Sequence, residues 1–377
     1  MSVEIVKVTT KKQLKSFIRF NCELYKGNPY FVPDLYEDML ATLDKEKNAA
    51  FEFCEADYFL AYKGDEIVGR VAAIINKKAN EKWNVSAVRF GWIDFIDDEE
   101  VSTKLLDTVE AWGRERGMHE VQGPLGFTDF DPEGLLIDGF DRVSTMATIY
   151  NYPYYGQHLE RLGYEKDVDW VEYLFKVPEK NWDKAERLSV LVAKRYKLHV
   201  VKCDSRRVLA KKYGKALFEL VNEAYSPLYG YSPLSEGQIK QFINSYLPLI
   251  DLRLISLVAD AEDNLVGIGV SLTSYATALQ KSGGRLFPFG WIHFLKPLFD
   301  RRPKRLDFLL MAVKPEYQSK GVNAMIINDL LPRYIEMGVV DIESNPELET
   351  NTKIQSQWEM FDKEQHKRRR AYKKELR

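Results

Sequence analysis

The chain has 377 residues, of which 45% are apolar and 29% charged, and its formal net charge is −2. This length suffices for two domains, and the near-neutral charge excludes a global field that would attract nucleic acid. Cys22, Cys54 and Cys203 are too few and too far apart for a disulfide framework or a cysteine-based zinc site. No apolar run approaches the roughly 20 residues that span a bilayer, and the N-terminus lacks a signal-peptide layout, so we expect a soluble cytoplasmic protein without a metal centre.

The predicted elements occur twice in the same order. Two helices, a hairpin, a strand and an amphipathic helix are predicted in the first half over residues 11–25, 34–43, 58–62 with 67–76, 87–95 and 105–112. The second half repeats them over 213–224, 236–247, 253–259 with 265–275, 306–313 and 324–337. The last helix of each half ends at a glycine, Gly117 or Gly338, placed like a C′ cap, and is followed by a short strand.

Insertions at 125–148 and 281–304 account for the changing offset between the halves. We therefore predict an α/β (α+β layered) protein made of two duplicated domains, 1–178 and 179–377. Each is expected to be a mixed, mostly antiparallel sheet flanked by helices. Two unrelated α/β domains are the alternative.

The most informative stretch, residues 318–324, lies between the predicted strand 306–313 and the predicted helix 324–337. A glycine-bearing turn in this place offers unpaired backbone N–H groups to an anion. The stretch resembles the pyrophosphate-binding loop of the GCN5-related N-acetyltransferases (GNAT), Gln/Arg-x-x-Gly-x-Gly/Ala. Gln318 and Gly321 match, whereas Asn323 stands where Gly or Ala is usual and Ala324 is one place late. An ordinary β–α turn with a solvated Lys320 is the alternative.

The order of elements is also similar to that of tandem GNAT-fold proteins over nearly the whole chain. The resemblance implies that two adjacent parallel strands diverge and that the pantetheine arm of acetyl-CoA or another acyl-CoA lies between them. It implies these cofactor-binding residues: Leu310, Met311, Ala312, Val313, Gln318, Ser319, Lys320, Gly321, Val322, Asn323, Ala324 and Asn351.

Amine acylation needs a base for the attacking ammonium and an acid for the leaving thiolate. The resemblance implies an acidic residue on the central strand, or water, as the base, and Asp307 and Glu343 are the candidates. Each carboxylate is equally compatible with a structural role. The family's acidic tyrosine falls at Trp358, a poor acid, so Tyr317 or Tyr372 is the substitute that we consider.

The first half lacks the glycine-bearing turn, because residues 96–104 contain no glycine and carry four consecutive acids, 97–100. Asp97 or Asp98 is expected to cap the following helix, so this half is not expected to bind CoA in the usual manner. The long loop that follows predicts a pocket for an amine substrate, with an aromatic interdomain contact as the alternative. The pocket residues are Asp138, Asp141, Asn151, Tyr154 and Tyr155. His158 is a further acid–base candidate, or a surface histidine.

Two further segments stand out. Residues 287–298 are rich in aromatic and aliphatic side chains and predict a lid over an acyl chain, a peripheral contact with a membrane or lipid, or a buried flap. The basic tail, 367–374, is predicted to be a solvated edge strand rather than a nucleic-acid site.

The leading hypothesis is an acyl-CoA-dependent N-acyltransferase that uses a small-molecule amine or a peptide as acceptor and binds CoA in its second half. A non-catalytic scaffold of the same fold is one alternative. An aminoacyl or long-chain acyl transferase acting on a lipid or envelope precursor is the other.

Overall fold

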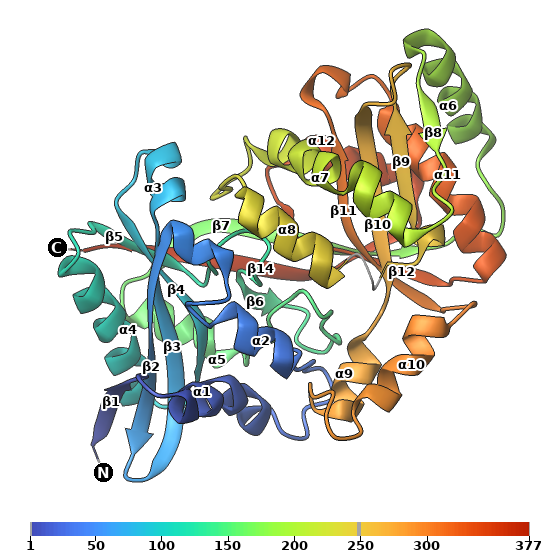
Figure 1. Cartoon of the computed structure of the whole chain (residues 1–377). Helices are drawn as coiled ribbons and strands as arrows, with labels where there is room; N and C mark the ends of the chain where they lie inside the picture. Colours follow the sequence, from blue (N-terminus) through green and yellow to red (C-terminus); the bar gives the residue numbers. More distant parts are fainter. Residues whose placement is uncertain (1, 247–249, 377) are drawn as a thin grey trace.

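The computed structural model describes residues 2–246 and 250–376. The two halves share one sheet, shown in Figure 1 running from the first half on the left to the second half on the right. Its strands lie in the order β1-β2-β3-β4-β5-β14-β7-β12-β11-β10-β9-β8, with β6 and β13 paired at its centre.

The elements of the first half follow the predicted order, and Gly117 follows α4 with a φ of 73°. They are β1 (Val3–Lys7), α1 (Lys11–Leu24), α2 (Tyr36–Thr42), β2 (Cys54–Lys63), β3 (Glu66–Asn76), α3 (Lys77–Trp83), β4 (Ala87–Phe95), α4 (Glu99–Arg114), β5 (Glu120–Gly123), β6 (Leu135–Asp138), α5 (Tyr154–Arg161) and β7 (Glu165–Lys176).

The second half repeats this order after an additional helix, α6 (Asp183–Tyr196), which the sequence analysis did not predict. Its elements are β8 (His199–Val201), α7 (Arg206–Tyr225), α8 (Glu236–Tyr246), β9 (Ile255–Ala259), β10 (Leu265–Thr273), α9 (Ala276–Ser282), α10 (Trp291–Phe299), β11 (Arg305–Val313), α11 (Val322–Met337), β12 (Asp341–Ser344), β13 (Glu347–Leu348), α12 (Thr352–Gln355) and β14 (Lys363–Glu375). The predicted end of α8, Leu247, lies outside the described residues.

The two halves exchange their last long strands. β14, from the end of the chain, lies between β5 and β7 and pairs antiparallel with both, while β7, from the first half, lies between β14 and β12. The side chains follow the exchange: Tyr372 of β14 belongs to the apolar core of the first half, and Val171, Tyr173 and Phe175 of β7 belong to a core of the second. Each half is therefore completed by the other's strand.

This exchange corrects the prediction for the basic tail. Residues 363–375 form a central strand rather than a solvated edge, and Lys367 and Arg369 are fully buried. Ladder hydrogen bonds satisfy the backbone on both sides, and Glu172 and Glu343 face the two buried cations. A basic composition alone could not reveal this, because the neutralising acids come from strands far away in the sequence.

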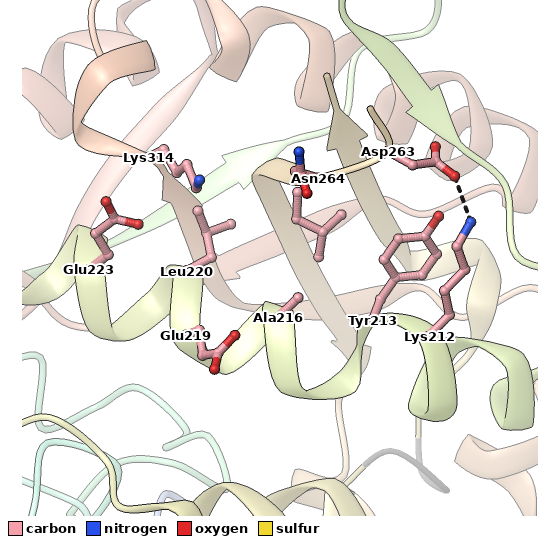
Figure 2. Close-up of a pocket in the computed structure, with 10 residues that line it drawn as sticks. Lys212, Tyr213, Ala216, Glu219, Leu220, Glu223, Asp263, Asn264 and Lys314 are labelled. Atoms are coloured by element: carbon pink, nitrogen blue, oxygen red, sulfur yellow. Dashed lines mark hydrogen bonds and ion pairs between the residues drawn. The ribbon is translucent and has the colours of Figure 1, made fainter. Parts of the chain in front are cut away.

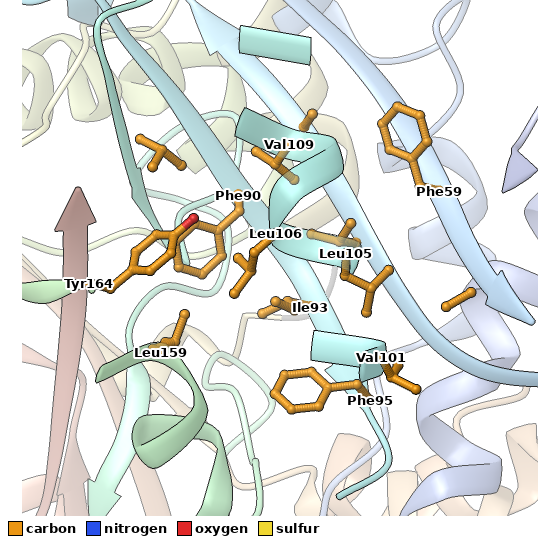
Figure 3. Close-up of a cluster of buried hydrophobic side chains, with 14 of the residues drawn as sticks. Phe59, Phe90, Ile93, Phe95, Val101, Leu105, Leu106, Val109, Leu159 and Tyr164 are labelled. Carbon is orange, nitrogen blue, oxygen red and sulfur yellow. The ribbon is translucent and has the colours of Figure 1, made fainter. Parts of the chain in front are cut away.

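The cores lie on the two faces of the sheet. Figure 3 shows α4 packed on β4, with Leu105 and Leu106 facing Phe90, Ile93 and Phe95. In the second half α11 covers one face and α7 the other, and each helix contributes a separate set of buried apolar residues. This two-layer covering of a shared sheet is the predicted fold class.

Candidate active site

The strands β11 and β12 run parallel and then diverge. They pair from Arg305–Asp341 to Phe308–Ser344 and no further. Immediately beyond, β11 has a bulge: Phe308 and Leu310 pair with the adjacent residues Ser271 and Val270 of β10, so Leu309 is the extra residue. From this point to its end, β11 has no strand neighbour on the side that faces β12 within residues 2–246 and 250–376.

Three carbonyl groups on that free edge accept hydrogen bonds from side chains instead of from a strand. Asn345 Nδ2 donates to Leu309 O at 2.8 Å, Tyr225 OH to Met311 O at 3.2 Å, and Gln318 Nε2 to Val313 O at 3.2 Å. These acceptors belong to every second residue of the strand, so their carbonyl groups point in the same direction. An extended ligand with amide groups could take the place of these polar side chains.

The free edge leads directly into the turn 318–324 and the N-terminus of α11. Ser319 and Gly321 both have left-handed backbone conformations, with φ of 59° and 85°, and no side chain caps the helix. The helix has no acidic residue in its first turn, and Ser319 and Lys320 are exposed. Ala324 N donates to Gly321 O at 3.0 Å, whereas the N–H groups of Val322 and Asn323 have no acceptor among the described residues, so they and the positive end of the helix dipole can face an anion.

These features bring most of the predicted cofactor residues together, since 310–313 form the free edge and 318–324 the turn and first helical residues. Asn351 is different: it begins α12, where its side chain accepts a hydrogen bond from Ile354 N. Asn345, six residues earlier, is the asparagine that bridges the diverging strands. In the sequence, only the position of Asn345 directly after β12 could have indicated that it bridges the two strands.

Asp307 and Glu343 lie side by side at the beginning of the same strands. They are paired in register across β11 and β12, and each is 1% exposed. Their neighbours in the strands, Leu306 and Ile342, belong to the core beneath α11, so the two carboxyl groups point to the opposite face.

The surroundings separate the pKa values of the two acids. Burial and the nearby charge of Glu343 raise the pKa of Asp307 to about 7. Burial also opposes ionisation of Glu343, but the adjacent His366 ring and the charges of Lys367 and Arg305 hold its pKa below the usual range. Such a division between two adjacent carboxyl groups is typical of acid–base sites.

The acid pair continues into a buried ionic cluster on the exchanged strands. Glu343 contacts Lys367 and Arg305, and its Oε1 lies 3.3 Å from His366 Nε2. Lys367 Nζ lies 3.8 Å from Glu172 Oε2, and Arg369 Nε donates to Glu172 Oε1 at 2.5 Å.

This cluster holds half of the ten buried side-chain polar atoms that lack a hydrogen-bond partner among the described residues. They are Asp307 Oδ1 and Oδ2, Glu172 Oε2, His366 Nε2 and Arg369 Nη2. Buried polar groups are normally satisfied, so this concentration points to a place where a ligand or water completes the bonding.

Tyr317 is not close to this pair along the strand. It lies in the 3₁₀ turn Pro315–Tyr317 beyond the other end of β11, where its ring contacts the Lys320 ammonium at 5.4 Å. The six residue steps from Asp307 to Val313 span roughly 20 Å in a strand. Tyr225, at the end of α7, instead places its hydroxyl on the free edge itself, and nothing in its sequence context indicated this position.

In the first half, the strand edge and the helix N-terminus that correspond to this site are closed by side chains of the same half. β5 pairs with β4 only from Ala87 to Arg89, yet the rest of β4 is covered: Tyr154 OH donates to Phe95 O at 2.6 Å, and Tyr155 OH accepts from Phe95 N at 3.0 Å. The Tyr155 ring stacks on Phe95 with centroids 4.2 Å apart. Leu159 and Tyr164 lie against the same strand in Figure 3.

The N-terminus of α4 is also closed. Asp98 Oδ1 accepts from the backbone N–H groups of Glu100 and Val101 at 3.0 and 3.2 Å, which is the predicted N-cap. Lys63 Nζ lies 2.5 Å from the other carboxyl oxygen of Asp98. The geometry thus offers neither a free strand edge nor a free helix end to a cofactor.

The predicted substrate pocket of the first half is not formed by the residues proposed for it. Asp138 and Asp141 are exposed, Asn151 bonds to the backbone of Leu136, and Tyr154 and Tyr155 fill the edge of β4. A loop rich in glycine and tyrosine does not distinguish a pocket from a packed plug.

Ser102, His158 and Asp97 are linked in a row, with Ser102 Oγ 2.7 Å from His158 Nδ1 and His158 Nε2 3.0 Å from Asp97 Oδ1. The set contains the residue types of a hydrolase triad. However, Ser102 is fully buried inside α4 and its hydroxyl donates to Glu99 O, so it cannot meet a substrate. His158 is buried too, which corrects the surface alternative.

A groove of about 370 Å³ lies elsewhere, between α7 and the β9–β10 turn. Figure 2 shows Lys212 and Asp263 paired at one end of it, with Lys314 and Glu223 near the other. Its lining residues do not include the acid pair, so we do not assign the chemistry to it.

No family model matches this chain. The structure is similar over its full length to a tandem GNAT protein from the clavulanic acid biosynthesis pathway, with a TM-score of 0.57, 10% identity and 99% of that chain covered. A protein from Enterococcus faecalis described as a probable N-acyltransferase is also similar in structure. The match covers 100% of this chain and 73% of that chain, with a TM-score of 0.53 and 8% identity. The predicted tandem GNAT fold is thereby confirmed.

Two proteins are similar in sequence. Protein YghO of Escherichia coli is 28% identical over 370 residues, which cover 97% of this chain and 94% of that protein. The bacterial ceramide synthase of Caulobacter vibrioides is 27% identical over 329 residues, 86% of this chain and 84% of that protein. Over the described residues, no helix combines the length and apolar character needed to cross a membrane.

Proposed function

We propose that the protein is an acyl-CoA-dependent N-acyltransferase whose donor site lies in the second half. The observation that carries this proposal is the free edge of β11 leading without interruption into the uncapped N-terminus of α11. In the first half both places are closed by the chain itself.

The residues present fit an acyl-CoA. The turn 318–324, which is exposed over its first three residues, would hold the pyrophosphate through backbone N–H groups, with Lys320 adding a positive charge. The carbonyl groups of Leu309, Met311 and Val313 would accept from the amide groups of the pantetheine arm once Asn345, Tyr225 and Gln318 turn away. When bound, the donor supplies a thioester carbon that an amine attacks, forming a C–N bond and releasing the CoA sulfur.

Asp307 is the proposed general base. Its pKa of about 7 leaves a substantial ionised fraction at neutral pH, and beyond the nearby Ser274 hydroxyl its oxygens lack a hydrogen-bond donor among the described residues. An ammonium group would provide that donor and then lose a proton to it. Glu343 remains ionised beside Lys367 and Arg305, and its charge keeps Asp307 basic.

Tyr225 is the proposed proton donor for the departing sulfur. Its hydroxyl lies beside the free edge, where a bound donor would displace it from Met311 O without removing it from the site, and burial raises its pKa above the usual range, so the hydroxyl is neutral and holds a proton to give. We expect Tyr225→Phe to lower kcat by about tenfold to a hundredfold while the affinity for CoA changes little.

The proposed acceptor is the amine of a long-chain lipid. One support is the similarity to a bacterial ceramide synthase, whose name denotes formation of an N-acylated lipid amine. The other is the exposed aromatic segment between β10 and β11, which lies at the Asp307 end of the donor strand. Acetyl transfer to a small soluble amine is the competing outcome.

Calorimetric titration of the protein with CoA and with acetyl-, octanoyl- and palmitoyl-CoA tests the donor site. We expect micromolar binding that falls at least tenfold in Lys320→Glu, an exposed position where the change reverses the charge at the turn without a steric clash. Gly321→Glu should be more severe, since an added Cβ would also meet Val192 at 2.8 Å.

Gly117→Glu is the matched control, because Gly117 has a similar φ of 73° and open space around it but lies outside the site. Absence of binding by the folded wild-type protein, or equal binding by Lys320→Glu, would contradict the donor site and favour a scaffold. Turnover of the bound donors with sphingoid-type and small amines then distinguishes a lipid acceptor from a soluble one.

A further inference from the structure

The segment between β10 and β11 exposes an apolar surface that none of the described residues covers. Phe287, Phe289 and Phe299 are 73%, 72% and 71% exposed, and Trp291, Ile292 and Leu295 are also exposed. α10 is strongly apolar, yet none of its residues is buried. A large exposed apolar surface of this kind marks an interaction site more often than a random feature of a soluble surface.

The segment is firmly held, so its exposure does not come from loose packing. α9 packs Tyr275, Ala276 and Leu279 against Val32 of the first half and against Phe294. Gln280 Nε2 donates to Pro29 O and Phe31 O at 2.8 and 3.0 Å, and Tyr36 N donates to Gly284 O at 2.7 Å. The inner side of the segment is fixed, and its outer side is left apolar.

The same segment is strongly basic. Residues 281–304 contain six lysines and arginines and one acid, Asp300, for a net formal charge of +5 in a chain whose total is −2. The basic residues are Lys281, Arg285, Lys296, Arg301, Arg302 and Lys304, and all six are exposed. Among the described residues, Lys296, Arg301 and Arg302 make no ion pair, and Glu37, the nearby acid of the first half, faces inward to accept from Leu286 N.

This surface lies at the acceptor end of the proposed site. The segment returns into β11 at Arg305, two residues before Asp307, whereas the turn 318–324 lies beyond the opposite end of that strand. The neighbouring layer is the first-half loop: Val143 packs beside α9, and its carbonyl oxygen accepts from Lys367 Nζ, the ammonium on Glu343. The apolar surface and the acid pair are thus separated by one packed loop.

We propose that the surface formed by residues 285–302 docks on the headgroup region of an anionic lipid bilayer. Its aromatic side chains enter the boundary between headgroups and acyl chains, and its cations face anionic phosphates; apolar insertion combined with basic charge is the pattern of interfacial segments. The role in delivering a lipid amine toward Asp307 rests on the proposed function, but the docking itself does not.

The test uses the full chain and vesicles of phosphatidylcholine with or without 30 mol% phosphatidylglycerol, sedimented at two salt concentrations. We expect the wild-type protein to bind the anionic vesicles, with weaker binding at high salt and a blue shift of Trp291 emission. Phe287→Ser combined with Phe289→Ser should weaken binding at least tenfold, as should Arg301→Glu combined with Arg302→Glu.

The matched control is Val190→Ser combined with Leu191→Ser on α6, where both side chains are also more than 60% exposed and Lys194 and Arg195 follow in the last turn, so the control separates docking by residues 285–302 from docking by any exposed apolar and basic surface. Equal binding by the wild type and the phenylalanine variant would overturn the proposal. So would a wild-type dimer in sedimentation velocity that the phenylalanine variant dissociates without change in vesicle binding, because the surface would then join two copies.

Failure of the docking and failure of the enzymatic proposal have different signatures. If only docking is wrong, CoA binding and acylation of a soluble short-chain amine persist while vesicles are ignored. If only the enzymatic function is wrong, vesicle binding keeps its dependence on Phe287 and Arg301 although no amine is acylated. The phenylalanine variant should therefore retain turnover of soluble amines and lose turnover of vesicle-embedded ones.

Discussion

The helices α4 and α11 occupy equivalent places in the two halves and have the same length, yet their N-termini are treated in opposite ways. α4 begins at Asp98, whose carboxylate takes two of the first N–H groups, and continues with Glu99 and Glu100. α11 begins at Gly321 in a left-handed conformation, without a side-chain cap or an acid in its first turn. A few residues before a helix thus decide whether this fold offers an anion site.

The strand before each helix makes the same distinction. Both β4 and β11 lose their parallel neighbour after a few residues and have a bulge opposite the preceding strand. Beyond that point β4 is covered by the buried Tyr155 and the half-buried Tyr154, whereas the edge of β11 accepts hydrogen bonds from three polar side chains among the described residues. One half has become a packed support, and the other keeps the geometry of a ligand site.

Separating the halves should have the largest effect. A chain of residues 1–178 lacks β14, so β5 and β7 lose the strand that joins them and the Tyr372 ring leaves the core of the first half. We expect each half alone to be insoluble or non-cooperative in unfolding, and co-expression of the two to restore a 1:1 complex. A monomeric, cooperatively unfolding fragment 1–178 would contradict the strand exchange as a requirement for folding.

Asp307→Asn should have the next largest effect, on catalysis. Removal of the proposed base should lower kcat by about 10²–10⁴-fold, since that is the usual contribution of general acid–base catalysis. The wild-type rate should rise with pH through about 7 and the variant's should not, while calorimetric CoA affinity stays within about twofold. The equivalent first-half position is Arg89, and loss of the pH dependence on changing Arg89 instead would reverse the assignment.

The pH dependence of the free energy of unfolding should report the protonation of the same Asp307 carboxyl group. Asp307 holds its proton more tightly in the folded state than in the unfolded chain, so its favourable contribution is complete at low pH and is lost as the pH rises from about 4 to 7. Relative to Asp307→Asn, the wild type should lose up to ~4 kcal/mol across that window. Urea unfolding of both proteins at pH 5 and pH 8 measures the part of this loss that falls above pH 5, about 2.7 kcal/mol; a constant difference between the proteins would show that the pKa is unperturbed.

Periodicity and turn chemistry predicted most of the fold. The hairpins, the helices before Gly117 and Gly338, and the strand 87–95 depend on local patterns, and the structure forms them where the sequence indicated, with Gly338 as the C-cap of α11 and Glu115 rather than Gly117 as the C-cap of α4. The strand exchange could not be predicted, because the pairing of β14 depends on buried charges far apart in the sequence. Glu172 and Arg369, for example, are separated by 197 positions. Local patterns say that a segment is a strand and do not say where in the sheet it lies.

The candidate site divides in the same way. The turn 318–324 and the edge 310–313 are contiguous in sequence and were predicted together, whereas Tyr225 and Asn345 reach the site only through the tertiary fold. In the first half, Tyr154 and Tyr155 bond to the backbone of Phe95 instead of lining a cavity. A small cavity of about 40 Å³ in that half is lined by other residues of the same loop, such as Leu135 and Tyr150, so a pocket for an amine there stays a prediction.

The smallest change tests whether the helix cap alone separates the halves. Asp98→Ala removes the acceptor for two N–H groups of α4 and should lower the free energy of unfolding by about 0.5–2 kcal/mol. Calorimetry should still find one CoA site per chain, because Tyr154 and Tyr155 continue to cover Phe95 and the acids Glu99 and Glu100 remain beside the helix end. A second site appearing in this variant would mean that the cap is the sole barrier and that the first half retains a latent donor site. One unchanged site would mean that the half lost its ligand through packing as well as charge, so that restoring it requires the strand edge to be emptied first.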